Sequence, residues 1–568
     1  MGTARRLYLY VVSAVSLIAL AAGINRLVAS VLVSIEDAVS STTMNPGGMA
    51  REQLSLAIAL IVVGAPVFAV HRWLVGRGLR AEGSAGEEDR ASALRAGYIA
   101  TIQSAALMAW LIGGAGFLSS VLERLVIPSS YASWSEPLGV ALTAFPIWAL
   151  FGRAREGEIR SQRMRGAAAW LTRLYRYGGG YGSLFMLLSG VTGLVSAVLN
   201  QLVAEPVMDG DQSFLAYAVA GSLGGIVLGG ASWLLHRRLA AAAVRDAAVI
   251  GEDDRQTRVR GLHDGLVLLT TATMTSLGVA AAVASLGRLV LGAEDVGMIR
   301  PLNDIAGPVL TMVPVALAGW WLAREAERTA LPFGAEAAGA VRRVQRLVLA
   351  ALGLTALAAG VAQLIGLAIE QVSGGYDMYS TSPANRLASD LAFVVVGAAL
   401  WVPSWLAQVA ARREDADREA HAAVARGYLY LAAGASLVVG VPTLVMALFQ
   451  VINGVLGGLF DSGSIRSLAT PLGSAVVAAA VGLYHGRLLV ADMRRLPRKG
   501  EVASGDPAVA ATPAAETPAA EMAEAGSKGT QARTLILLVP DGVNADQVVQ
   551  AMRAHLPQGA TLEEDAAG

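Results

Sequence analysis

The chain has 568 residues, of which 54% are hydrophobic and 15% are charged, and its mean hydropathy is +0.53. A soluble chain carries about 25% charged residues. The formal net charge is zero, so no bulk basic character suggests nucleic acid as a partner. The absence of cysteine excludes disulfides, thiolate metal sites and thiol nucleophiles.

Apolar residues fall in long segments separated by short polar stretches, which is the pattern expected when lipid is the solvent. About twenty apolar residues are needed to cross ~30 Å of hydrocarbon as a helix. Twelve segments meet this requirement, at 7–33, 52–75, 97–127, 134–152, 174–203, 213–236, 261–291, 301–323, 346–371, 387–409, 427–457 and 467–490. The sequence therefore predicts an all-α polytopic membrane protein with the lipid bilayer as its main partner.

Arginine is distributed unevenly between the connecting loops. The loops that follow every second segment hold clusters such as Arg72, Arg77 and Arg80, whereas stretches 34–50 and 128–137 hold no Lys or Arg. Under the positive-inside rule the arginine-rich loops and both termini are cytoplasmic. We expect the protein in the cytoplasmic (inner) membrane.

Two sequence patterns recur along the chain. Helix starts carry an arginine followed by tyrosines, as in Arg6-Leu7-Tyr8-Leu9-Tyr10 and Arg173-Leu174-Tyr175-Arg176-Tyr177, with degraded copies near Arg260 and Arg346. An acidic run, Glu87-Glu88-Asp89-Arg90, recurs before the seventh and eleventh segments only. The period of about 165–170 residues predicts three tandem four-helix units, or six helical hairpins, at 1–165, 166–336 and 337–497.

This arrangement resembles a bacterial integral-membrane domain of unknown function, found as tandem repeats that open with an Arg-Leu-Tyr-x-Tyr box. The resemblance covers about residues 1–495. It implies a membrane location and no established activity, so it assigns no catalytic residue to this chain.

The composition changes after the last apolar segment. Residues 498–531 are rich in Ala, Pro and Glu and are predicted to be a disordered linker. Residues 532–568 are predicted to form a small α+β, strand-helix-strand module in the cytoplasm, with the first strand at 534–539. A unit this small is below the usual size for independent stability, so we expect it to bind a protein partner or to self-associate.

Three histidines occupy equivalent positions near the arginine-rich ends of even-numbered segments: His71, His236 and His485. They could act as proton relays, pH sensors or haem or metal ligands. The favoured interpretation is structural, because a polar residue at this level caps the negative helix end and anchors the headgroup interface.

Polar positions recur near the opposite ends of the segments, at Arg26, Glu52, Arg124, Arg288, Asp304 and Glu370. We expect ion pairs that lock each hairpin, such as Arg26 with Glu52 and Arg288 with Asp304. The alternative interpretation is a polar vestibule for a substrate or ion.

No motif supports catalysis. The chain lacks HExxH, GxSxG and a P-loop, and its glycine-rich stretches lie within apolar segments. The sequence favours a non-enzymatic membrane scaffold or sensor without a cofactor, which presents its C-terminal module to a partner. The alternative is a transporter or channel for an ion or small solute.

Overall fold

The computed structural model describes most of the predicted membrane region. The described residues are 3–40, 47–80, 82, 84–127, 132–160, 167–203, 212–245, 257–292, 300–373, 382–456 and 462–495. The chain divides into two compact units, Met1–Pro497 and Arg498–Gly568. The predicted linker and α+β module belong to the second unit and lie outside the described residues.

Twelve described helices are long and apolar enough to cross a membrane. They are α1 (Thr3–Ser40), α2 (Gly47–Arg80), α4 (Ala93–Val126), α5 (Ser135–Arg160), α6 (Ala167–Val203), α7 (Gln212–Arg245), α9 (Arg258–Val290), α10 (Arg300–Ala330), α11 (Ala335–Val372), α12 (Pro383–Glu414), α14 (Ala423–Leu456) and α15 (Ser462–Arg495). The twelve predicted segments are confirmed: each lies within one of these helices or passes its end by a single residue. Most of the helices are longer than the predicted apolar segment. Helical backbone continues past the apolar stretch because water and headgroups tolerate the polar ends.

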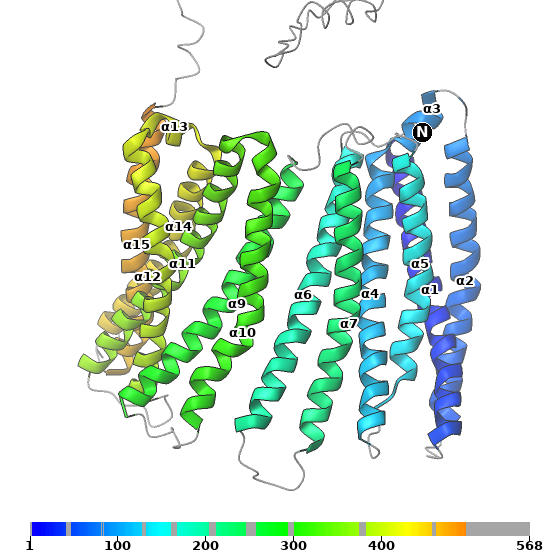
Figure 1. Cartoon of the computed structure of the whole chain (residues 1–568), viewed down its shortest axis with the longest axis horizontal. Helices are drawn as coiled ribbons and strands as arrows, with labels where there is room; N and C mark the ends of the chain where they lie inside the picture. Colours follow the sequence, from blue (N-terminus) through cyan, green and yellow to red (C-terminus); the bar gives the residue numbers. More distant parts are fainter. Residues whose placement is uncertain are drawn as a thin grey trace, which may run out of the picture. The chain divides into compact units, whose positions relative to one another are not determined.

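Consecutive long helices form six hairpins that lie in a row in chain order (Figure 1). The same contact recurs at every joint between hairpins: the first helix of one hairpin packs on the second helix of the next. The packed pairs are α1 with α5, α4 with α7, α6 with α10, α9 with α12 and α11 with α15. The first helices therefore form a spine in which those of the first five hairpins contact two second helices each, whereas α14 packs on α15 alone among the described second helices. The substantial contacts stay between neighbouring hairpins.

Small residues allow this close packing. A Cβ added at Gly224 of α7 would lie 2.5 Å from the backbone oxygen of Ala115 in α4. Gly473 of α15 lies equally tightly against Ala362 of α11. Lipid tails are as apolar as leucine, so close backbone approach and dispersion, rather than hydrophobic exclusion, hold such joints together.

Two short helices lie on the same side of the row of hairpins but at its two opposite ends (Figure 1). They are α3 (Ser84–Arg90) and α13 (Ala416–His421), and each precedes the long helix that opens the second hairpin of a predicted unit. Both correspond to the recurring acidic run in the sequence. A short 3-10 helix, η2 (Leu331–Phe333), joins α10 to α11.

Candidate functional site

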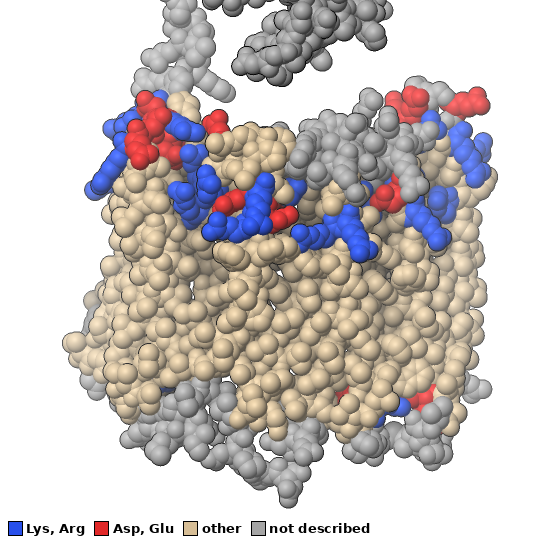
Figure 2. All heavy atoms as spheres, in the orientation of Figure 1, with Lys and Arg blue, Asp and Glu red and all other residues tan. Residues whose placement is uncertain are grey.

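Charged side chains gather along one side of the row, at the level where α1, α4, α6, α9, α11 and α14 begin. We call this side the arginine-rich end. Figure 2 shows a band of arginine with interspersed Asp and Glu at this level, above a broad uncharged surface. Arginine and tryptophan are favoured where a helix leaves the hydrocarbon, because their apolar parts remain in lipid while the polar groups reach water.

All three predicted histidines lie near this end and share one geometry. His71, His236 and His485 each contact a tyrosine of the first helix of their hairpin, with ring centroids 5.7 Å apart in all three pairs. The partners are Tyr8, Tyr175 and Tyr428. The predicted equivalence of the histidines is therefore visible in their contacts.

The histidines do not cap helix ends, which corrects the structural interpretation drawn from the sequence. Each Nδ1 contacts the carbonyl oxygen one turn earlier in its own helix, at 2.7 Å for His71, 2.8 Å for His236 and 3.0 Å for His485. The helices continue to Arg80, Arg245 and Arg495, which is more than two turns further. His236 and His485 are buried against aromatic rings, with 2% and 1% exposure.

A buried polar cluster surrounds the Tyr175–His236 pair. The guanidinium of Arg155 in α5 lies 4.1 Å above the Tyr175 ring and donates to Gln103 at 2.8 Å. Oε1 of Glu156 lies 3.3 Å from Nη2 of Arg155 and 3.5 Å from Nη2 of Arg176. One carboxylate therefore forms ion pairs with two buried arginines. Nε and Nη1 of Arg176 have no hydrogen-bond partner among the described residues.

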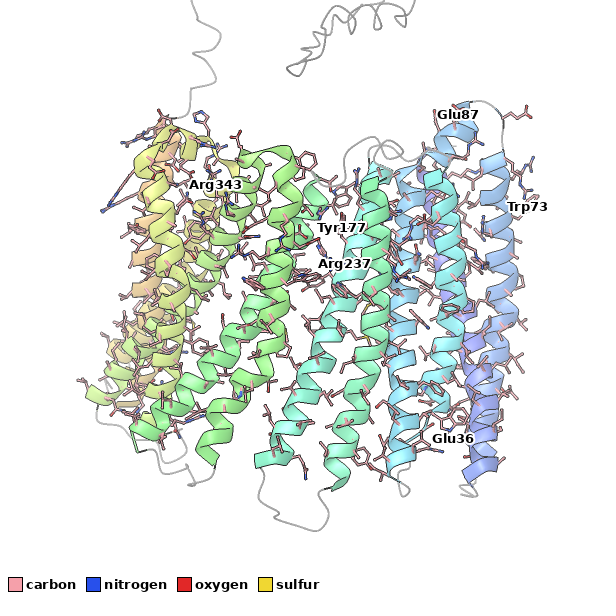
Figure 3. The ribbon with its side chains drawn as sticks, viewed as in Figure 1. Glu36, Trp73, Glu87, Tyr177, Arg237 and Arg343 are labelled. Atoms are coloured by element: carbon pink, nitrogen blue, oxygen red, sulfur yellow. The ribbon has the colours of Figure 1, made fainter. Side chains whose placement is uncertain are left out.

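Beside this cluster is a cavity of about 500 Å³ between α6, α7, α9 and α10, which we call the interhairpin pocket. Its lining includes four arginines and two acidic residues: Arg176, Arg237, Arg238, Arg260, Asp264 and Glu325. Figure 3 shows Tyr177 and Arg237, both lining residues, at the arginine-rich part of α6 and α7. The pocket is thus basic and lies at the arginine-rich end of the helices.

The predicted polar positions at the opposite end behave differently from one another. Arg26 and Glu52 are both exposed and form no ion pair with each other. Arg288 donates to Ser285 of its own helix at 2.7 Å, and Asp304 is exposed. The two hairpin pairs predicted as examples are therefore wrong, because these side chains do not face each other across their hairpins.

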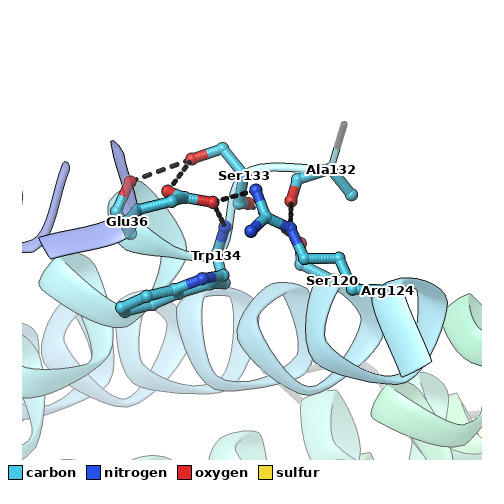
Figure 4. A network of polar contacts seen from close by, with 7 residues as sticks. Glu36, Ser120, Arg124, Ala132, Ser133 and Trp134 are labelled. Carbon is cyan, nitrogen blue, oxygen red and sulfur yellow. Dashed lines mark hydrogen bonds and ion pairs between the residues drawn. The ribbon is translucent and has the colours of Figure 1, made fainter. Parts of the chain in front are cut away.

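The remaining two predicted positions, Glu370 and Arg124, each form an ion pair. Glu370 binds Arg386 across the α11–α12 hairpin, as the hairpin-locking interpretation expects. Arg124 instead binds Glu36 of α1, a residue the sequence did not single out (Figure 4). Glu36 also accepts from Ser133 at 2.9 Å, and Arg124 donates to the Ala132 carbonyl at 2.6 Å. This network joins α1 of the first hairpin to α4 and the α4–α5 connection of the second.

The lining arginines were also missed, although the sequence holds one signal for them. Position four of the arginine-tyrosine box is Leu9 in the first copy and Leu429 in the last, but Arg176 in the third. Leu9 and Leu429 are 4% and 0% exposed, and Arg176 is 5% exposed. Arg176 thus places a guanidinium where the first and last copies bury a leucine.

Twelve apolar helices in tandem hairpins define a multi-pass integral membrane protein. The chain belongs to the family described as Domain of unknown function (DUF5671), which matches it three times, at residues 6–150, 173–318 and 343–480. These matches confirm the predicted three tandem repeats, and each covers most of two hairpins. No curated protein and no solved structure matches the chain.

The three matches begin at Arg6, Arg173 and Arg343. The degraded sequence box was placed near Arg346, but Arg343 makes the contact equivalent to that of Arg6, as described below. Among the described residues, no group of three or more His, Cys, Asp or Glu side chains could hold a metal ion.

Proposed function

We propose that the protein is a non-enzymatic scaffold or sensor of the cytoplasmic membrane. In this proposal the row of hairpins is the membrane-embedded platform. The residues after 497 extend into the cytoplasm and there bind a protein partner or a second copy. Both termini are cytoplasmic because the arginine-rich end carries the positive charge.

One observation carries this proposal. The helices of the spine have no Asp, Glu, Lys or Arg over long central stretches, at 7–25, 96–122, 177–199, 265–287, 347–369 and 427–456. Ion-coupled carriers usually place ionisable groups near the middle of the membrane, where they face a cavity or one another. A spine without such groups favours a membrane scaffold or sensor over a transporter or channel.

Two pairs of hydroxyl groups in the spine bond across helix contacts, which supports the same conclusion. Ser183 of α6 bonds Ser232 of α7 at 2.7 Å, and Tyr181 bonds Thr270 of α9 at 2.6 Å. Paired hydroxyls of this kind join helices in lipid. Neither pair contains an acidic, basic or imidazole side chain.

The alternative function is transport of an ion or small solute. Asp390 favours it, because this carboxylate lies two turns inside α12 and its buried Oδ2 has no hydrogen-bond partner among the described residues. A partly unsatisfied carboxylate inside a membrane helix is costly and is often functional.

The test is a flux measurement on the purified full chain in liposomes. We expect no movement of protons or small ions above that of empty liposomes, measured with an entrapped pH dye under an imposed gradient. The matched variants are Asp390→Asn and a triple change of His71, His236 and His485 to Gln. Flux in the unmodified chain that either variant abolishes, at unchanged membrane insertion, would replace the scaffold proposal with transport.

A further inference from the structure

The interhairpin pocket has more positive charge than its acidic residues neutralise. Four arginines line it against two carboxylates, so the lining carries a formal excess of two positive charges with neutral histidines. Uncompensated charge is unfavourable at the edge of the hydrocarbon unless water or a bound anion offsets it.

The two ion pairs within the lining are loose. Arg237 Nη2 lies 3.7 Å from Glu325, and Arg260 Nε lies 3.8 Å from Asp264. Both distances exceed an ordinary charge-assisted hydrogen bond of about 2.7–2.9 Å. The guanidinium groups therefore keep donors available for another acceptor.

Aromatic rings hold one of these guanidinium groups in place. Arg237 lies 4.3 Å from the ring centroid of Trp321 and 5.5 Å from that of Trp233. Stacking on rings orients the planar fork and lowers the entropy that a ligand must overcome. Arg176 is fixed differently, since it is buried beside Glu156 with two nitrogen atoms unpartnered among the described residues.

We propose that the interhairpin pocket binds a phosphate-bearing anion at the arginine-rich end, with Arg176, Arg237 and Arg260 as its donors. Planar guanidinium groups match phosphate oxygens in pairs, which favours phosphate over a small spherical anion. The cavity of about 500 Å³ accommodates a lipid headgroup. This site goes beyond the proposed function, because it holds whether the protein is a platform or a transporter.

The position of the pocket favours a phospholipid headgroup as the source of the phosphate. Arg176 lies about 14 Å along α6 from its first residue, Ala167, and the apolar part of the helix follows. Leu322 and Trp233 provide an apolar wall beside the charges. Basic pockets between membrane helices suit the headgroups of anionic lipids for this reason. A soluble phosphate has the same chemistry and is separated from the lipid by the test.

The test uses the purified full chain in a neutral detergent. Short-chain phosphatidylglycerol, phosphatidylcholine of equal chain length and inorganic phosphate are titrated separately, and binding is measured by native mass spectrometry and by the thermal unfolding midpoint. We expect phosphatidylglycerol to bind at least about tenfold more tightly than phosphatidylcholine. Changing Arg237 and Arg260 together to Gln should weaken that binding by about tenfold or more, as expected from lost charge-assisted bonds.

The matched control is Arg324→Gln, which removes an arginine that also stacks on a tryptophan of α10 but lies outside the pocket. Ala241→Glu provides a second variant, because this exposed lining position accepts a carboxylate without disturbing the core. It should also abolish the preference for phosphatidylglycerol.

The three probes give distinct outcomes. Binding of inorganic phosphate that the paired arginine change abolishes would support the site and assign it to a soluble phosphate. Equal binding of the two lipids, with no binding of phosphate, would overturn the proposal. A preference for phosphatidylglycerol that survives both the paired arginine change and Ala241→Glu would overturn it as well.

Discussion

Gly179 and His236 show how one small residue determines the environment of a buried imidazole. The ring of His236 lies directly against the Cα of Gly179, so that a Cβ added there would lie 2.8 Å from His236 Cδ2. His236 is therefore buried between α6 and α7 with its Nδ1 bonded to Ser232. The neighbouring Gly178 has nothing within 4 Å of an added Cβ.

The first prediction compares these two glycines. Gly179→Ala should lower the thermal unfolding midpoint in detergent, because overpacking costs about 1–3 kcal/mol and exceeds the gain of about 1 kcal/mol in helix propensity. Gly178→Ala should leave the midpoint unchanged or raise it. His236→Ala should remove most of the effect of Gly179→Ala. Equal effects of the two glycine changes would show that the imidazole does not occupy this position.

At the scale of elements, α3 and α13 explain the acidic run that recurs in the sequence. Asp89 of α3 lies 2.6 Å from Arg6, and Glu419 of α13 lies 2.6 Å from Arg343. Each acid stands four residues before the next long helix and is buried, at 5% and 2% exposure. The short helices thus connect the first helix of a repeat to the start of its second hairpin. The third acidic run, at 252–255, lies outside the described residues.

The second prediction is a pair of double-mutant cycles on thermal stability. Arg6→Gln and Asp89→Asn should each destabilise the protein, and the double change should cost less than the sum by about 0.5–3 kcal/mol. The same cycle on Arg26→Gln and Glu52→Gln serves as the control and should be additive, because these exposed side chains do not meet. Coupling in the control cycle, or additivity in the first, would contradict the observed pairing.

For the whole molecule, the row of hairpins resembles a repeat protein placed in lipid. Each hairpin contacts chiefly its neighbours through the same first-to-second-helix joint. In such arrays stability is approximately a sum of terms from single repeats and their interfaces. Within the described helices, each terminal hairpin packs chiefly on a single neighbouring hairpin, and α14 exposes a long series of leucine and valine side chains that suit contact with lipid.

The third prediction is the orientation of the row. Reporter fusions after Gly83, Gly157 and Gly251 should report the cytoplasm, and fusions near Gly47, Gly210 and Gly375 should report the opposite side. The physical reason is the clustering of arginine at one end of the described helices. A reversed signal from both sets of fusions would invert the proposed topology and place both termini outside.

The sequence alone determined the number of helices, their limits and the threefold repeat. Each of these depends on a local property: the length of an apolar stretch, the position of arginine, or the recurrence of a short pattern. It also identified the three equivalent histidines, because their spacing to the ends of the apolar stretches is constant.

Only the tertiary structure decided which helices meet. Membrane helices are apolar on all sides, so no amphipathic pattern marks the face that packs on a neighbour. Arg124 therefore forms an ion pair with Glu36 of another hairpin, whereas the sequence had suggested an acidic partner in its own hairpin. Likewise, Arg176, Arg237 and Arg260 are far apart in the chain and line one pocket because α6, α7 and α9 converge there.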